Sequence, residues 1–179
     1  EASPTSPVIG NETQVSMRTA VAVAREISVE ANREFQKSDL YFSFGQNARS
    51  VEGTSAGAAM TIATLALLLD LKLNQTVAIT GSINANGTIG PVGGVLQKAS
   101  ALRDSGYVLF IVPTGESIEK STTVNEVQDC KERQLKNGVF RVCTVKHQAS
   151  VNSIAVNETG ISVVEVDDIR QAIELMVQN

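Results

Sequence analysis

A serine at the start of an apolar segment is the first residue whose surroundings suggest chemistry. Ser55 lies in Gly53-Thr54-Ser55-Ala56-Gly57, directly before a long apolar run. If that run is a helix, its first backbone N–H groups lack helical partners, and with the positive end of the helix dipole they can bind a developing oxyanion. The flanking glycines let a substrate backbone approach closely. The same position also suits a serine that merely caps the helix, so Ser55 alone leaves both interpretations open.

A lysine further along the chain is the second such residue. Lys98 lies in a predicted helix that opens at Gly93-Gly94, and no carboxylate occurs three or four positions away from it. Its neighbours one turn away are all uncharged: Gly94, Val95, Ala101 and Leu102. A lysine on an apolar face either extends its amine to water or is buried, and burial lowers its pKa. Both interpretations remain open for Lys98 taken alone.

The two residues are more informative as a pair. A serine hydroxyl is a weak nucleophile until a base takes its proton. The only histidine, His147, lies in the polar stretch Lys-His-Gln-Ala-Ser and is expected to be a surface residue. Lysine is the other base that serves serine, in Ser–Lys pairs, and for this its pKa must fall from about 10.4 to about 7–8. The pair predicts acyl transfer, with Ser55 as nucleophile and Lys98 as general base.

Three motifs between Val51 and Pro113 resemble the proteolytic domain of Lon proteases, peptidase family S16. That family carries G-P-S-A-G around its nucleophile, an M-T-G-E-I-like strand, and P-I/V-G-G-(x)-x-x-K with its lysine. This chain reads GTSAG at 53–57, AITGSI at 78–83 and GPVGGVLQK at 90–98. Ser55 precedes Lys98 by 43 residues (98 − 55) and Thr80 precedes it by 18 (98 − 80), which matches the family without gaps. More loosely, Glu12-Thr13-Gln14 resembles archaeal Lon-like proteins.

The resemblance assigns roles to individual residues. Ser55 would be the nucleophile, Lys98 the base, and Thr80 would orient the lysine by hydrogen bonding. Glu52 stands where the family often has Asp, and Thr54 where it has Pro; these departures alter the loop beside the nucleophile but not the dyad. The histidines that bacterial members carry on the preceding strand are absent from residues 40–44. The supporting residues implied around the dyad are Glu52, Gly53, Thr54, Ala56 and Thr80.

The resemblance also implies an α/β fold like the second domain of ribosomal protein S5, with helices packed on mixed β-sheets. The expected organisation is a linker or N-terminal arm over residues 1–12 and one serine peptidase domain over 13–179. Hydrolysis would need no cofactor; ATP would enter only through an ATPase module elsewhere in the full protein, because the chain has no G-x-x-x-x-G-K-[ST] loop. The implied partners are polypeptide substrates, further copies in a hexameric ring, and an ATPase module or membrane anchor.

Two alternatives to a peptidase are considered. One is a catalytically inactive Lon-like module that binds peptides or partners. The other is a non-enzymatic domain of the same fold that binds nucleic acid. The net charge of −4 and the absence of a cluster of Lys and Arg beyond two or three residues argue against a nucleic-acid partner, because phosphate binding needs a concentrated positive patch.

Composition and periodicity give the elements that must position these residues. The 179 residues, 42% apolar and 19% charged, fit one globular domain. The longest apolar run spans residues 56–69 and is too short for the roughly 20 residues that cross a bilayer, so it predicts a buried helix. The pattern predicts helices over 14–35, 55–71, 93–105 and 123–135, and a last helix that Asp167 caps and that ends at about Val177. It also predicts strands over 40–44, 76–83, 107–112, 139–145 and 161–166, and a turn at Asn86-Gly87.

Two cysteines bear on the compartment. Cys130 and Cys143 form either a disulfide or two separate buried thiols. A disulfide favours a location outside the cytosol, as do four N-x-[ST] sequences, at Asn11, Asn74, Asn86 and Asn157. We therefore expect an extracytoplasmic or membrane-attached protein, with a cytoplasmic location as the alternative.

Overall fold

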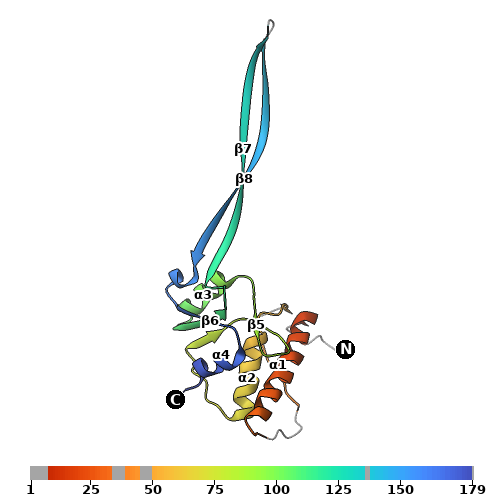
Figure 1. The fold of residues 1–179 in the computed structure, drawn as a ribbon, viewed down its shortest axis with the longest axis vertical. Helices are drawn as coiled ribbons and strands as arrows, with labels where there is room; N and C mark the ends of the chain where they lie inside the picture. Colours follow the sequence, from red (N-terminus) through yellow and green to blue (C-terminus); the bar gives the residue numbers. More distant parts are fainter. Residues whose placement is uncertain (1–7, 34–38, 45–49, 136–137, 179) are drawn as a thin grey trace, which may run out of the picture. The chain divides into compact units, whose positions relative to one another are not determined.

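The computed structural model describes residues 8–33, 39–44, 50–135 and 138–178. The chain divides into two compact units, which we call the main unit and the hairpin unit. The main unit comprises Glu1–Ser117 and Val156–Asn179, and the hairpin unit comprises Ile118–Ala155. Helices and short strands make up the first, and a single long pair of strands makes up the second (Figure 1).

A three-stranded parallel sheet runs through the main unit. Its strand order is β3 (Val77–Ile79), β6 (Leu109–Pro113) and β9 (Ser162–Val166). The middle strand is β6 because its uninterrupted apolar run suits a strand covered on both faces. Ile111 packs into one apolar cluster, whereas Phe110 packs into another. The buried strand predicted over 107–112 is thus confirmed from Leu109 onward, but it ends at Pro113, and Val108, which is 58% exposed, lies outside it.

Helices cover both faces of this sheet (Figure 1). On the face of Ile111, the apolar cluster includes residues of α1 (Asn11–Glu30), α2 (Gly57–Leu69) and α4 (Ile169–Met176). On the face of Phe110, it includes residues of α3 (Val95–Asp104). The sequence of α2 is apolar almost all round, as expected of a helix enclosed by its neighbours.

Two short strand pairs complete the main unit. β1 (Val8–Ile9) pairs in parallel with β2 (Ser50–Val51). The residues expected to form an arm, 1–12, are described from Val8 onward, where they form β1 and the start of α1. β4 (Ser82–Ile83) and β5 (Ile89–Gly90) form an antiparallel hairpin. This hairpin confirms the turn predicted at Asn86-Gly87.

The segment predicted as one strand over 76–83 is two strands in different sheets. β3 ends at Ile79 and β4 begins at Ser82. The N–H of Thr80 still donates to the Ile111 carbonyl at 3.0 Å, but the N–H of Gly81 donates to the Ser55 carbonyl, also at 3.0 Å. A Cβ on Gly81 would lie 2.3 Å from the side chain of Ile89. The close approach at Gly81 therefore separates two segments that both look extended in sequence.

Several helix ends differ from the prediction. The helix predicted over 14–35 begins at Asn11 and ends at Glu30, because Asn32 has a left-handed backbone with φ of 54°; residues 34–35 lie outside the described residues. The last helix is capped by Asp168 rather than Asp167, since the Asp168 carboxylate accepts from the Arg170 N–H at 2.8 Å.

Residues 40–44 were predicted to form a strand, and this prediction is wrong. Their alternation is real: Phe42 and Phe44 pack against the core, while Tyr41 between Leu40 and Phe42 is 92% exposed. The described backbone, however, offers the segment no strand partner. An alternating pattern indicates which side chains pack against the core. A strand also requires a neighbouring strand with which its backbone can form hydrogen bonds.

The hairpin unit overturns the helix predicted over 123–135. Residues 118–135 form strand β7 (Ile118–Leu135), paired with β8 (Gly138–Ala155). Each strand has 18 residues and so extends for about 60 Å at about 3.4 Å per residue. Leu135 pairs with Gly138, and the Asn137-Gly138 dipeptide is a strong hairpin signal. That signal outweighs the helical spacing of a few apolar residues.

A disulfide crosslinks this hairpin. Cys130 is disulfide-bonded, and Cys143, the chain's only other cysteine, is its register partner in β8. An isolated two-stranded hairpin is marginally stable in water. The crosslink contributes about 3 kcal/mol by restricting the unfolded chain, on the chain-entropy account. The alternative of two separate buried thiols is therefore wrong.

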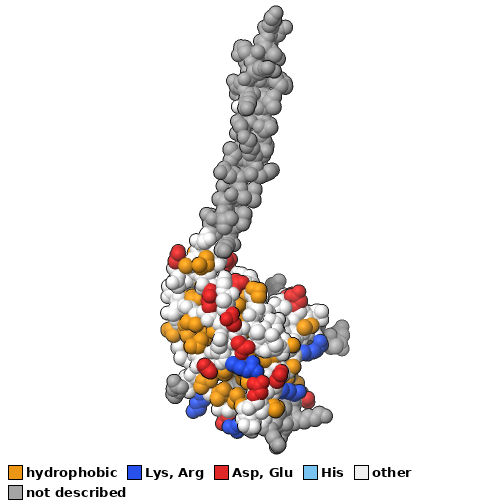
Figure 2. All heavy atoms as spheres, viewed as in Figure 1, with side chains coloured by type: hydrophobic (Ala, Val, Ile, Leu, Met, Phe, Trp, Pro, Cys, Tyr) orange, Lys and Arg blue, Asp and Glu red, His pale blue; other side chains and the backbone are white. Residues whose placement is uncertain are grey.

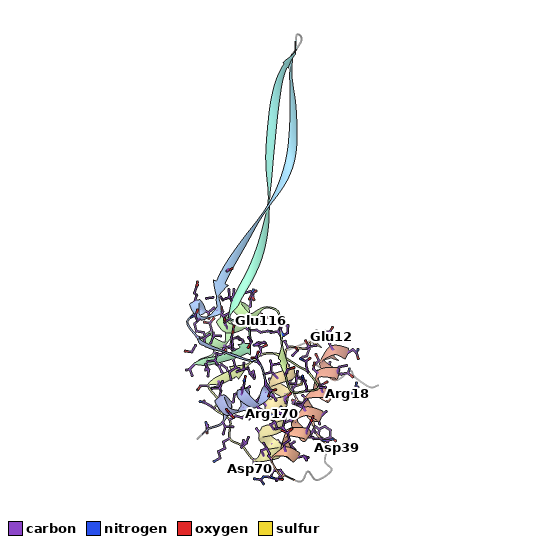
Figure 3. All side chains as sticks on the ribbon, in the orientation of Figure 1. Glu12, Arg18, Asp39, Asp70, Glu116 and Arg170 are labelled. Atoms are coloured by element: carbon purple, nitrogen blue, oxygen red, sulfur yellow. The ribbon has the colours of Figure 1, made fainter. Side chains whose placement is uncertain are left out.

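Charged side chains are scattered over the described surface. On the face shown in Figure 2, acidic and basic side chains are interspersed. Arg170 of α4 (Figure 3) pairs with Glu30 of α1 at 2.9 Å, and this hydrogen bond raises the pKa of the arginine. Hydrogen bonds from Ser117 lower the pKa of Glu165. These partly exposed pairs each contribute at most about 1 kcal/mol.

The chain is thus a mixed α/β protein, as predicted at the level of fold class. The finer expectation, a likeness to ribosomal protein S5 domain 2, stays a prediction. In the part of the chain that the structure describes, no helix combines the length and apolar character needed to span a membrane.

Candidate active site

Ser55 lies in the turn between β2 and α2 and is half-buried. The helix cap is Ala56, and no side chain caps the helix, so Ser55 does not serve as an N-cap. Within the described backbone, the N–H groups of Ser55 and Ala56 have no backbone acceptor. Such N–H groups at the positive end of a helix are suited to bind a negatively charged oxygen.

The loop before Ser55 is held by the start of α1. Thr13 is fully buried, and its hydroxyl donates to the Gly53 carbonyl at 3.0 Å. The Glu52 carboxylate accepts from the Glu12 N–H at 3.3 Å, where the positive end of α1 favours a negative charge. Gly53 has φ of 98°, a conformation that disfavours any side chain. Glu52 and Gly53 thus connect the loop to the start of α1; their role as supporting residues of a dyad stays a prediction.

The remaining two supporting residues of the loop, Thr54 and Ala56, contribute through their backbone. The Thr54 carbonyl accepts from the Gly57 N–H at 2.9 Å, and the Ala56 carbonyl accepts from the Met60 N–H at 2.9 Å. These bonds form the first turn of α2. Thr54, in the position of the family's proline, is exposed.

Thr80 connects the serine loop to the sheet. It is 4% exposed, and its hydroxyl donates to the Ser55 carbonyl at 3.3 Å. The Gly81 N–H donates to the same carbonyl, and the Gly81 carbonyl accepts from the Ala58 N–H, both at 3.0 Å. Two hydrogen bonds therefore fix the carbonyl of Ser55 to the segment that follows β3, and a third, from Ala58, fixes the start of α2 to the same segment.

Lys98 reaches the same hydroxyl from the other side of the sheet. Its amine donates to the Thr80 hydroxyl at 3.3 Å and to the Gly93 carbonyl at 2.9 Å. Gly94, with φ of 70°, directly follows Gly93 and is the N-cap of α3, so the tight turn at the two glycines brings that carbonyl next to the lysine. Lys98 is half-buried. Thr80 is thus hydrogen-bonded both to Lys98 and to the backbone carbonyl of Ser55.

Other candidate groups lie elsewhere or are absent from the described residues. His147 is in β8, opposite Glu126, within the hairpin unit. No group of three or more His, Cys, Asp and Glu side chains is placed to hold a metal ion in the described ranges. The described chemistry of the site is therefore that of a hydroxyl, an amine and backbone N–H groups.

Sequence reasoning did not identify the structural roles of Thr13 and Gly93. The sequence contained a weak signal for Thr13, its place in Glu12-Thr13-Gln14, but nothing in it shows that the hydroxyl reaches a loop 40 residues away. Gly93 was assigned only to the opening of a helix. Its role as an acceptor depends on the turn at Gly94, which becomes visible only in three dimensions.

Comparison with known proteins relates the chain to a class of peptidases. The family model described as the Lon protease (S16) C-terminal proteolytic domain matches residues 6–157. The chain is 30% identical over 119 residues to an archaeal Lon protease of Methanocaldococcus jannaschii, and the aligned region covers 63% of the chain and 18% of that protein. It is 30% identical over 147 residues to a Lon protease of Elusimicrobium minutum, and the aligned region covers 82% of the chain and 17% of that protein.

A second archaeal Lon protease, from Thermoplasma volcanium, is 26% identical over 140 residues, or 76% of the chain and 21% of that protein. The chain belongs to the family of Lon protease (S16) proteolytic domains. The resemblance inferred from the motifs is thereby confirmed. The chain spans about a fifth of the length of these relatives.

Proposed function

We propose that the main unit is a serine endopeptidase domain that cleaves unfolded or flexible polypeptides through a Ser–Lys dyad. Ser55 is the nucleophile and Lys98 the general base. The observation that carries this proposal is the Thr80 hydroxyl, which accepts from the Lys98 amine and donates to the Ser55 carbonyl. Membership of a peptidase family supports the same assignment.

The hydrogen bonds of Lys98 support its role as a base. Because the Thr80 hydroxyl gives its own proton to the Ser55 carbonyl, it acts as an acceptor toward the lysine. A neutral amine has two hydrogens and one lone pair. In its neutral form the amine can donate hydrogen bonds and can also accept the proton of Ser55 on its lone pair.

The reaction then proceeds in two stages. Lys98 takes the hydroxyl proton as the Ser55 oxygen bonds to the substrate carbonyl carbon, and the carbonyl electrons move to an oxyanion bound by N–H groups at the start of α2. As the carbon–nitrogen bond breaks, the lysine ammonium returns the proton to the leaving amine. Water next attacks the acyl-enzyme, giving a proton to Lys98, which passes it to the departing Ser55 oxygen.

Thr80 acts in this scheme as a positioning residue. Thr80→Val removes the hydroxyl at nearly constant volume, and we expect kcat/KM for a fluorogenic peptide to fall about 10- to 100-fold, by analogy with second-layer groups that orient a ligand. Thr80→Ser restores the hydroxyl and should recover most of the activity. Equal losses in both variants would show that packing rather than the hydroxyl matters. Thermal unfolding of both variants provides the control for stability.

A labelled fluorophosphonate tests the proposal directly, since only an activated serine takes the label. Folded protein that takes no label and cleaves no peptide would instead be an inactive module that binds peptides or partners. The proposal requires no cofactor for hydrolysis in this chain. It also includes no nucleic acid, in keeping with the interspersed charges of Figure 2.

Assembly and location are further parts of the proposal. The family resemblance suggests a hexameric ring, with an ATPase module or a membrane anchor in the full protein, and the crosslinked hairpin favours a compartment outside the cytosol. We expect weak self-association of the chain, because contacts between small domains alone bury little area. Sedimentation at rising protein concentration should show oligomers. A strict monomer up to millimolar concentration would argue against a ring built by this chain alone.

A further inference from the structure

Four asparagines of the main unit begin Asn-x-Thr sequences, and the proposed peptidase mechanism uses none of them. They are Asn11, Asn74, Asn86 and Asn157. Such a sequence, with a middle residue other than proline, is the acceptor of N-linked glycosylation in secreted proteins. The chain has 11 Asn and 14 Thr among 179 residues, so chance gives about 0.8 such sequences (10 × 14/179, since the last Asn has no residue two positions later). The excess points to a modification of this surface.

The accessibility of the side chains separates the four sequences. Asn86 and Asn157 are exposed, whereas Asn74 is half-buried. Asn11 is exposed as well, but Thr13, which completes its sequence, is fully buried and holds the serine loop through its hydroxyl. A glycosyltransferase cannot contact that hydroxyl in the folded protein. The two exposed sequences that remain are those of Asn86 and Asn157.

The turn between β4 and β5 presents Asn86 to solvent. The Gly87 N–H donates to the Asn84 carbonyl at 3.0 Å and closes this turn. The side-chain oxygen of Asn86, Oδ1, accepts from the Thr88 N–H at 3.2 Å and from the Thr88 hydroxyl at 2.8 Å. Among the described residues, none accepts a hydrogen bond from the Asn86 amide nitrogen, Nδ2. The turn therefore engages the oxygen of this amide and leaves its nitrogen accessible.

Asn157 lacks this arrangement. It lies in the 3₁₀ helix η1 (Val156–Thr159), where the Thr159 hydroxyl donates to the Val156 carbonyl at 2.7 Å rather than to the asparagine. The half-buried Asn74 does accept from the N–H and the hydroxyl of its threonine. Asn86 is thus the one asparagine of the four that is both exposed and hydrogen-bonded to the threonine of its own sequence.

The two hydrogen bonds to Oδ1 favour transfer of a sugar to Nδ2. They draw electron density toward the oxygen, so a proton on Nδ2 is lost more readily. In the transfer, Nδ2 gives one proton to a base of the glycosyltransferase and bonds to the anomeric carbon of a lipid-linked oligosaccharide. The bond between that carbon and the phosphate of the lipid breaks, and the phosphate leaves with the electron pair. The step involves no oxidation or reduction.

We propose that Asn86 is an N-glycosylation site, which takes an oligosaccharide from a lipid-linked donor. The inference rests on the location outside the cytosol that is proposed above, where such donors are used and where the disulfide of the hairpin unit is stable. It does not depend on the Ser–Lys dyad. A sugar at this exposed turn meets solvent rather than the core, so the folded protein can carry it.

Mass spectrometry of the protein purified from its own organism tests the site. Trypsin releases residues 73–98 as one peptide, which also contains Asn74 and Asn84, so fragmentation by electron transfer is needed to locate the sugar. We expect a sugar mass on Asn86. Asn84 is the matched control, because it is exposed in the same turn but has no Ser or Thr two positions later. An unmodified Asn86, or a sugar on Asn84, would overturn the proposal.

Two variants of Thr88, produced in the same organism, test the role of the hydroxyl. Thr88→Ala removes it and should lower the fraction of molecules modified at Asn86 by about tenfold or more. Thr88→Ser keeps a hydroxyl and should retain most of the modification. Equal modification of both variants would contradict recognition of the Asn-x-Thr sequence. The denaturation midpoint of each variant shows whether the protein is folded.

The state of the disulfide and fluorophosphonate labelling separate this proposal from the others. If Cys130 and Cys143 are oxidised in the purified protein but Asn86 is unmodified, the glycosylation proposal alone fails. If the cysteines are reduced, the proposed location fails and the glycosylation proposal fails with it. Asn86→Gln removes the site and should take the label at the rate of the unsubstituted protein, because Ser55 and Lys98 are unchanged. A protein that is glycosylated but takes no label would refute the peptidase proposal alone.

Discussion

Ser55→Ala should abolish cleavage of an unfolded protein or fluorogenic peptide while leaving the fold intact. The expected fall in kcat is at least about 10³-fold, because the remaining N–H groups bind the oxyanion but nothing attacks the carbonyl. The fold should persist, since Ser55 is bound to its neighbours through its backbone carbonyl, which alanine retains. Initial rates and labelling by fluorophosphonate measure the effect, and circular dichroism checks the fold.

An exposed serine of the same unit gives the control for this experiment. Ser162→Ala, in β9, changes the same functional group away from the candidate dyad and should retain activity and labelling. Full activity in a correctly folded Ser55→Ala protein would rule out the proposed mechanism.

Replacing Lys98 should remove activity to a comparable extent. Lys98→Arg keeps the positive charge, but a guanidinium cannot lose its proton in the working pH range and so cannot act as a base. Lys98→Ala also lacks the base; it should be no less stable, because removing a partly buried amine removes its desolvation cost. In the unsubstituted protein the rate should rise with pH as the neutral amine becomes populated.

Lys72→Arg is the matched control, since Lys72 is an exposed lysine outside the candidate site, and it should behave as the unsubstituted protein. The measurements are the pH–rate profile for each active protein and the denaturation midpoint for each variant. An active Lys98→Arg protein would contradict the dyad and direct the search for a base to His147 first.

More of the candidate site than of the surrounding fold could be predicted from the sequence. Ser55, Thr80 and Lys98 could be grouped because their motifs have a characteristic order and spacing, and Thr80 is hydrogen-bonded both to Lys98 and to the Ser55 carbonyl. The anchoring of the serine loop by Thr13 could not be predicted. It depends on the packing of α1, which local periodicity does not report.

The errors in the fold have a common physical origin. Residues 40–44 and 123–135 were both assigned from side-chain patterns, yet backbone partners decide both cases. The first segment lacks a strand partner in the described residues, whereas the second has a full partner in β8. The division at Thr80-Gly81 is of the same kind, because a hydrogen bond from Gly81 to Ser55 separates two strands of similar composition.

The hairpin unit also has a consequence for the order of folding. β6 and β9 are neighbours in the sheet, but residues 114–161 separate them in the chain. Closing so long a loop from an unstructured chain is entropically unfavourable and slows folding. The ends of the hairpin, Ile118 and Ala155, are register partners, so a hairpin that forms first brings β9 close to β6 before the sheet assembles. The disulfide keeps the two strands of the hairpin linked even in the unfolded chain. Oxidised chains should therefore refold faster than reduced ones.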